Sequence, residues 1–185
     1  IIPSVKIKAA SSIGQYTYDN NPYLYLGADS YTVAVGQSNL KNYKVAGGPQ
    51  RAYSIGFEYR DPNYWFVGVT SNFFTNTYID ISPLTRTQNF YLAQDGLPFN
   101  DYNLNIAQDL LSQEKFDDYM VMNMIGGKSW RIDNYYVGFF ASINNILNQK
   151  YRTGGFEQGR NANYQELLQD VNKPKRVFGP KSWYG

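Results

Sequence analysis

The chain of 185 residues contains neither histidine nor cysteine. Without histidine it lacks the commonest general base and metal ligand, and without cysteine it can form neither a disulfide nor a thiolate site. It also lacks a nucleophile elbow, and the run Gly127-Lys128-Ser129 misses the upstream glycine of a phosphate-binding loop. We therefore expect no catalytic residues, no cofactor and no metal site, so the protein is not expected to be an enzyme.

The carboxylates do not change this expectation. Asp117 and Asp118 lie side by side in the sequence, but no acidic group of the chain has the spacing of an EF-hand calcium loop. Glu157 and Glu166 flank a segment that a substrate could contact, yet nothing in the sequence sets the separation that glycoside hydrolysis requires.

Charge is also scarce. Charged residues make up 17% of the chain, against about 25% in an average protein, and the net charge is only +2. No basic stretch is interleaved with aromatic residues, which argues against nucleic acid as a partner. Aromatic residues reach 17%, with 18 Tyr, while the mean hydropathy is −0.50. This composition fits an outer-membrane barrel or a carbohydrate-binding β protein better than an ordinary cytosolic enzyme.

No hydrophobic run approaches the roughly 18 residues of a membrane helix, so strands would have to do any membrane crossing. Residues 52–60 and 135–147 alternate between apolar side chains and small or polar ones. Strands with one apolar and one polar face are typical of a transmembrane β-barrel. A soluble β-sandwich also alternates, so the pattern alone leaves both open.

Five strands are predicted, over residues 5–18, 51–60, 64–79, 119–131 and 135–147. The third, with about sixteen residues and a length of about 50 Å, is too long for an ordinary soluble domain. In the fourth, Asn123 and Lys128 have opposite parity and can share a polar face only after a slip of one residue. Gly126 and Gly127 lie between them and predict a β-bulge.

The connections between the strands alternate in length. Short turns are expected at about 61–63 and 132–134, and long connections at about 19–50, 80–117 and 148–182. The second long connection contains a helical pattern over 103–115, and the third contains one at 164–168. Both short turns fall on the same side of an antiparallel sheet and are bordered by aromatic residues: Tyr59, Tyr64, Trp65, Trp130, Tyr135 and Tyr136. Short periplasmic turns with an aromatic belt, opposite long extracellular loops, are typical of outer-membrane barrels.

Residues 137–151, VGFFASINNILNQKY, resemble the penultimate-strand signature of TonB-dependent outer-membrane receptors, particularly the SusC-like group of Bacteroidetes. The runs GGFEQGRN at 154–161 and VFGPKSWYG at 177–185 are similar to the last extracellular loop of that group. The similarity extends upstream to residues 53–65 and 73–83, and so covers most of the chain. The order of these segments is more specific than any one of them.

This resemblance implies an all-β fold, with residues 1–185 as a partial C-terminal barrel domain. About five antiparallel strands of a roughly 22-stranded transmembrane barrel would be present. The family's plug, its TonB-contact motif and its aromatic-ended last strand are not found in the sequence. The expected partners are therefore the rest of the barrel and its plug, the TonB–ExbB–ExbD system, outer-membrane lipid and a SusD-like surface lipoprotein.

The function implied is energised uptake of a glycan, peptide or metal complex across the bacterial outer membrane. Two alternatives stay open: a receptor-type barrel that serves as scaffold in a larger outer-membrane complex, and a soluble carbohydrate-binding β domain. Candidate ligand contacts combine stacking surfaces with hydrogen-bond donors, although the same residues would serve equally to pack the loops together. They are Arg86, Phe90, Tyr91, Arg160, Asn161, Asn163 and Tyr164. Glu58 and Arg60 have the parity of lumen-facing residues.

Overall fold

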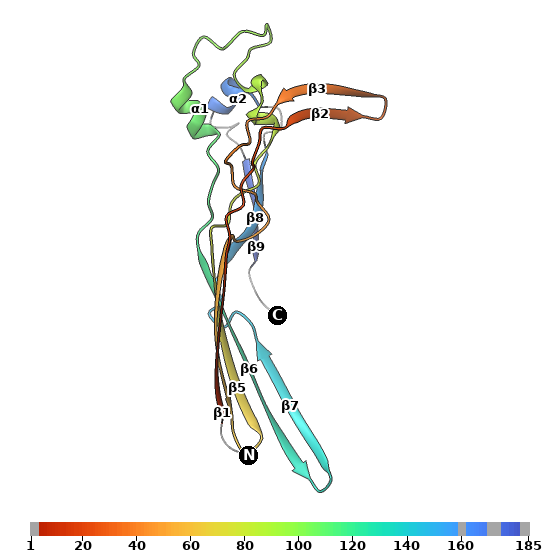
Figure 1. Ribbon diagram of the computed structural model, residues 1–185, viewed down its shortest axis with the longest axis vertical. Helices are drawn as coiled ribbons and strands as arrows, with labels where there is room; N and C mark the ends of the chain where they lie inside the picture. The colour runs from red at the N-terminus through yellow and green to blue at the C-terminus, as the bar shows by residue number, and fades with distance from the viewer. Residues whose placement is uncertain (1–3, 159–161, 170–174, 182–185) are drawn as a thin grey trace.

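The chain is all-β. A computed structural model describes residues 4–158, 162–169 and 175–181, and its main element is a five-stranded antiparallel sheet (Figure 1). The strand order is β1-β4-β5-β6-β7. These strands are β1 (Ser4–Ile13), β4 (Arg51–Arg60), β5 (Trp65–Thr75), β6 (Tyr119–Ile132) and β7 (Tyr135–Ile143).

Two smaller hairpins lie in segments that were predicted as long connections. One pairs β2 (Tyr23–Ala28) with β3 (Tyr31–Gln37), and the other pairs β8 (Tyr151–Gln158) with β9 (Lys175–Lys181). Both ladders contain a register shift, between Leu24 and Tyr25 in the first and between Arg152 and Gly155 in the second. Such a shift interrupts the simple alternation by which a strand is recognised in sequence.

Four short helical elements gather at one end of the sheet, opposite the short turns (Figure 1). We call this group the head. It consists of η1 (Leu84–Arg86), η2 (Gln88–Phe90), α1 (Leu104–Leu110) and α2 (Tyr164–Leu168). The helix expected over 103–115 is therefore shorter than predicted, whereas α2 occupies the predicted residues. Among the described residues, no helix is long and apolar enough to cross a membrane.

The register of the sheet places most of the larger apolar residues of all five strands on one side, whereas Phe66, Phe74, Val121, Ile125 and Phe140 lie on the other. Each of the four strand pairs is antiparallel and runs without a register shift. The groups that alternation predicts for separate strands therefore join into a single surface, which we call the apolar face. Its larger side chains include Val5, Ile7, Tyr53, Ile55, Phe57, Tyr59, Trp65, Val67, Val69, Phe73, Met120, Met122, Met124, Trp130, Ile132, Tyr135, Val137, Phe139 and Ile143.

The predicted bulge in β6 is wrong. The pairing of β6 with β5 and with β7 continues through Gly126 and Gly127 in a single register. Asn123 therefore lies on the side opposite the apolar face, which we call the polar face, while Lys128 lies on the apolar face itself. Gly127 has a different role, because a Cβ there would lie 2.7 Å from the carbonyl oxygen of Phe139 and 2.8 Å from the Phe66 ring. Gly127 thus allows the Phe139 backbone and the Phe66 ring to approach closely, and it does not mark an inserted residue.

Three strands end earlier than predicted. β1 stops at Ile13, β5 stops at Thr75 with 11 residues, and β7 stops at Ile143. Asn76 and Asn145 follow two of these ends with φ angles of 60° and 49°, in the left-handed region that asparagine tolerates better than most residues. The Asn145 side chain also donates to the carbonyl of Gln149 and accepts from its amide, both at 3.0 Å, which closes a tight turn.

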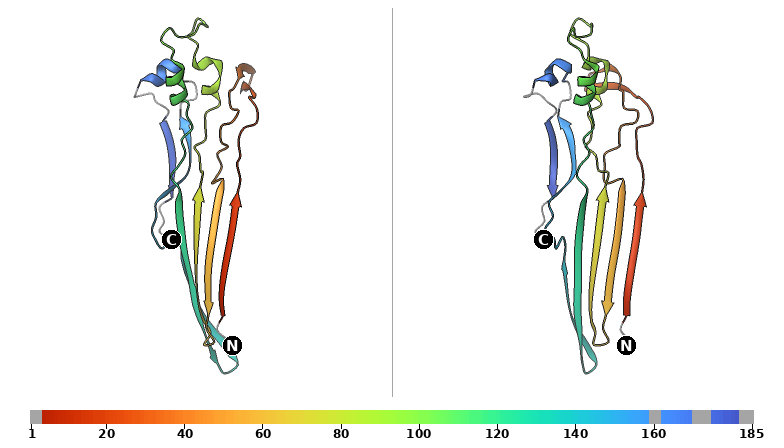
Figure 2. Two further views of the ribbon diagram at one scale, coloured as in Figure 1. Left: turned by 60° about the vertical axis from the view of Figure 1, so that its left-hand side comes forward. Right: turned by 90° about the vertical axis from the view of Figure 1, so that its left-hand side faces the viewer.

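The sheet bends toward its polar face. In the right-hand view of Figure 2, β6 runs downward with β5 on its right. The backbone amide of Ser129 in β6 donates to the carbonyl oxygen of Tyr64, just before β5, and so points to the right in this view. For an L-residue this direction places the Ser129 side chain, and with it the polar face, behind the sheet. The side behind the sheet is the right-hand side of Figure 1, toward which β7 and the β2–β3 hairpin both extend. The polar face is therefore concave, and the hairpin reaches out above it.

Candidate functional site

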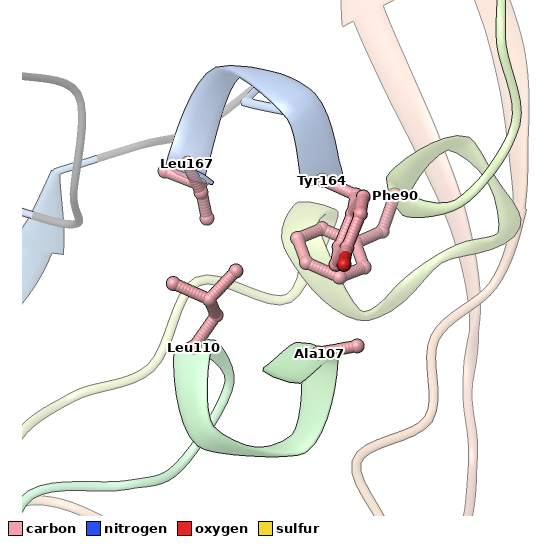
Figure 3. Packing of buried hydrophobic residues seen from close by; sticks show 5 residues of the cluster. All are labelled: Phe90, Ala107, Leu110, Tyr164 and Leu167. Atoms are coloured by element: carbon pink, nitrogen blue, oxygen red, sulfur yellow. The ribbon is translucent and has the colours of Figure 1, made fainter. Parts of the chain in front are cut away.

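The head has a small hydrophobic core of its own. Phe90, Ala107, Leu110, Tyr164 and Leu167 are buried against one another, and they come from η2, α1 and α2 (Figure 3). The rings of Phe90 and Tyr164 meet edge to face, with centroids 6.1 Å apart. The second and third long connections thus pack on each other, so that α1 does not simply fold within its own loop.

Side-chain caps explain why two such short helices form. The Asn103 side chain accepts hydrogen bonds from the amides of Asn105 and Ile106 at the start of α1. Asn163 begins α2 with a reciprocal capping box, in which its side chain accepts from the Glu166 amide and the Glu166 carboxylate accepts from the Asn163 amide. Each cap satisfies amides that the first helical turn leaves without partners.

A buried ion pair links η1 to the β8–β9 hairpin. Arg86 donates through Nη1 and Nη2 to the two carboxylate oxygens of Glu157, and the side chains of both residues are 2% exposed. The guanidinium also donates to the carbonyls of Ser82 and Leu111, and it lies over the ring of Tyr43 with Cζ 5.1 Å from the centroid. Burial lowers the pKa of Arg86, but the hydrogen bonds and charges of Glu157 and Tyr43 together raise it by more, so the guanidinium stays charged.

Most candidate ligand contacts that the structure describes are engaged in packing. Arg86, Phe90 and Tyr164 are buried, and Asn163 caps α2. Tyr91 is half-buried, with its ring centroid 5.9 Å from that of Tyr102. Arg160 and Asn161 lie outside the described residues. The arrangement favours the packing role that the sequence analysis left open for these residues.

A pocket that the sequence did not indicate lies between the top of β6 and the start of β8. It has a volume of about 340 Å³ and is lined by residues of both charges and by two tyrosines: Asp117, Asp118, Tyr119, Gln149, Lys150, Tyr151 and Arg152. The rings of Tyr119 and Tyr151 are stacked, with centroids 4.1 Å apart and planes at 11°. Tyr119 is paired with Phe74 on the polar face, so the pocket opens at the head end of that face. Among the described residues, no group of three or more carboxylates could hold a metal ion.

The polar face carries the ion pairs of the sheet. Glu58 accepts from Arg60 at 2.5 Å and from Lys8 on the neighbouring strand at 3.3 Å. Both Glu58 and Arg60 lie on this concave side, where their parity places them. β1 and β7 are the edges of the described sheet, so its five strands alone do not close around this side.

The apolar face has no cover among the described residues. Ile7 is 73% exposed, Phe139 65% and Ile55 60%, and these residues come from three different strands. Soluble monomers seldom leave an apolar surface of this extent uncovered.

The β2–β3 hairpin also exposes apolar side chains. Tyr25 on one side and Leu26 and Tyr31 on the other are all exposed. A two-stranded hairpin of this kind is marginally stable alone in water. It is a second exposed apolar surface, separate from the sheet.

The site geometry thus comprises an uncovered apolar face, a concave polar face, and a head with its own small hydrophobic core at one end. The chain matches no protein-family model, no curated protein and no solved structure.

Proposed function

We propose that this chain forms part of the wall of a TonB-dependent outer-membrane receptor, which imports a glycan, a peptide or a metal complex through a plugged barrel. The observation that carries the proposal is the continuous apolar face, because five strands with different sequences each direct most of their larger apolar residues to it. In a bacterial outer membrane, lipid would cover this face. The polar face would then line the lumen, and the head would lie on the extracellular side.

The dimensions of the apolar face support a membrane location. Arg51 and Lys128 are the only charged residues that the register of the described sheet places on this face, and they pair with Thr75 and Trp65 at the two ends of β5. The 11 residues of β5 extend over about 33 Å. With a strand tilt of about 40°, this length spans about 25 Å, the height of the apolar band of outer-membrane barrels.

The connections support the same orientation. The turns after Arg60 and Ile132 are short, whereas the other connections of the sheet hold the head and both hairpins. Tyr59 and Trp65 contact each other beside one turn, with centroids 5.1 Å apart, and Tyr64 and Tyr136 meet at 6.0 Å between the two turns. Aromatic side chains concentrated at one rim fit a membrane–water interface.

One observation favours the scaffold alternative as a second candidate. The β2–β3 hairpin extends from the head over the concave side and exposes tyrosines and aliphatic residues on both of its surfaces. A protein partner seated on the head, such as a SusD-like surface lipoprotein, would cover them. A receptor that takes up solute and a receptor that serves as a scaffold would need the same sheet. The two candidates are therefore distinguished by whether solute enters the cell.

The experiment that tests the proposal follows the native polypeptide in membrane fractions. We expect a heat-modifiable protein in the outer-membrane fraction, resistant to extraction by carbonate or urea, with peptides on both sides of residues 1–185. Its solute uptake is expected to stop when TonB is deleted. Membrane residence with no uptake in either strain would favour the scaffold. A membrane-free protein of 21.2 kDa would contradict both and support the soluble carbohydrate-binding domain.

A further inference from the structure

Lys128 occupies an unusual place on the apolar face. Its register partners on the two neighbouring strands are Trp65 and Phe139, and the next residue of β6 on the same face is Trp130. Its ammonium lies over the Trp130 ring, with Nζ 5.8 Å from the centroid. None of the ion pairs among the described residues involves Lys128, although Lys8, Arg60, Arg86, Lys115 and Arg152 all have carboxylate partners.

The neighbouring carboxylates are engaged elsewhere. Glu58 is held by Lys8 and Arg60 on the opposite face. Asp61, in the nearer short turn, accepts from the Tyr59 hydroxyl at 2.9 Å and from the Asn63 amide at 2.8 Å. Lys128 thus presents an ammonium group, with three donors, within an aromatic frame and without an anionic partner among the described residues.

The surface on the head side of Lys128 is shallow. The next row of the apolar face consists of Val67, Gly126 and Ala141, which pair with one another. A Cβ at Gly126 would contact only the Phe66 carbonyl oxygen, at 3.4 Å, so the space outside this glycine is open. This row of small side chains leaves open space beside Lys128, as a hydrocarbon chain below a charged headgroup would require.

We infer that Lys128, framed by Trp65, Trp130 and Phe139, binds the phosphate of a phospholipid headgroup in the leaflet on the short-turn side, with an acyl chain over Gly126. The inference rests on the proposed function, since it requires lipid against the apolar face. Lysine suits this role because its long stem crosses apolar surface while its charge stays at the interface. Arg51 marks the opposite border of the apolar face, but it lacks such an aromatic frame.

The test uses the complete receptor, purified in mild detergent and examined by native mass spectrometry. Phosphatidylglycerol is the probe, and diacylglycerol with the same acyl chains is the phosphate-free comparison. We expect Lys128→Gln to reduce retention of phosphatidylglycerol by about fivefold, the effect of one interfacial cation, and to leave diacylglycerol unchanged. Lys128→Arg should retain the lipid. Lys6→Gln, which removes the same charge from the polar face, is the matched control.

Equal retention by Lys128→Gln and the unaltered receptor would overturn the inference, as would an equal loss in Lys6→Gln, which would indicate a net-charge effect. Competition by glycerol phosphate at millimolar concentration would assign the site to free phosphate and would likewise overturn it. Heat-modifiability of each variant verifies that the barrel has assembled. Failure to recover the unaltered receptor from membranes would contradict the proposed function itself, which distinguishes the two failures.

Discussion

At the scale of single residues, the Arg86–Glu157 pair decides how the head is joined to the hairpin next to it. The two residues are 71 positions apart, and both side chains are almost fully buried. Desolvating two charges is costly, but removing one partner costs more because it leaves the other buried alone. The pair is therefore expected to hold η1 against β8 firmly while it is intact.

Replacing Arg86 by methionine should destabilise this junction by about 3 to 5 kcal/mol, since Glu157 would remain as an unpaired buried charge. Amide exchange in residues 79–90 and 151–157 of the detergent-solubilised protein should rise about 100-fold or more. The double variant Arg86→Met with Glu157→Gln should recover much of the protection. Unchanged exchange in the single variant would show that the pair contributes little.

The small helices of the head show, at the scale of elements, how local chemistry starts a structure that packing completes. α2 has only five residues, too few to be stable alone, yet it has a full capping box and buries Tyr164 and Leu167. Asn163 was a candidate ligand contact because amides suit hydrogen bonding to solutes. Its place at the start of α2 offers a different reason for asparagine at this position.

Asn163→Ala should therefore weaken the head by about 1 kcal/mol, because the Glu166 amide loses its acceptor. Asn163→Asp keeps a capping oxygen and should preserve stability. Hydrogen exchange of residues 164–168 measures both. A ligand role would give another result: both variants would lower solute affinity, and neither would change exchange in the absence of solute.

At the scale of the whole molecule, the two faces of the sheet are expected to meet different surroundings. Val69 lies near the middle of β5 on the apolar face, and Thr70 is its neighbour on the polar face. Under the proposed function, Val69→Lys puts a charge at the bilayer midplane and should cost about 2 to 4 kcal/mol. We expect a clear loss of heat-modifiable protein from the outer membrane. Thr70→Lys should assemble normally, and an equal effect of both changes would contradict a lipid-facing apolar face.

More of the structure of the sheet than of the head could be predicted from the sequence. The parity of Tyr53, Ile55 and Phe57 requires only neighbouring residues of one strand, and the register confirms it. Lys128 shows where such reasoning fails: a charged residue on the apolar side suggested a slip at Gly126 and Gly127, but the strand keeps its register. In this place the lysine lies beside Trp65 and Phe139 of the neighbouring strands, and its ammonium lies over the ring of Trp130.

Alternation, turn residues and connection lengths are local properties of a chain, and by themselves they determined the all-β class, the two faces and the side on which the short turns lie. Only the tertiary structure decided the direction in which the sheet curves and the place of the β2–β3 hairpin above its concave side. The same holds for the ion pair between Arg86 and Glu157. These features depend on contacts between residues far apart in sequence. Their energies come from burial and pairing that no single segment contains.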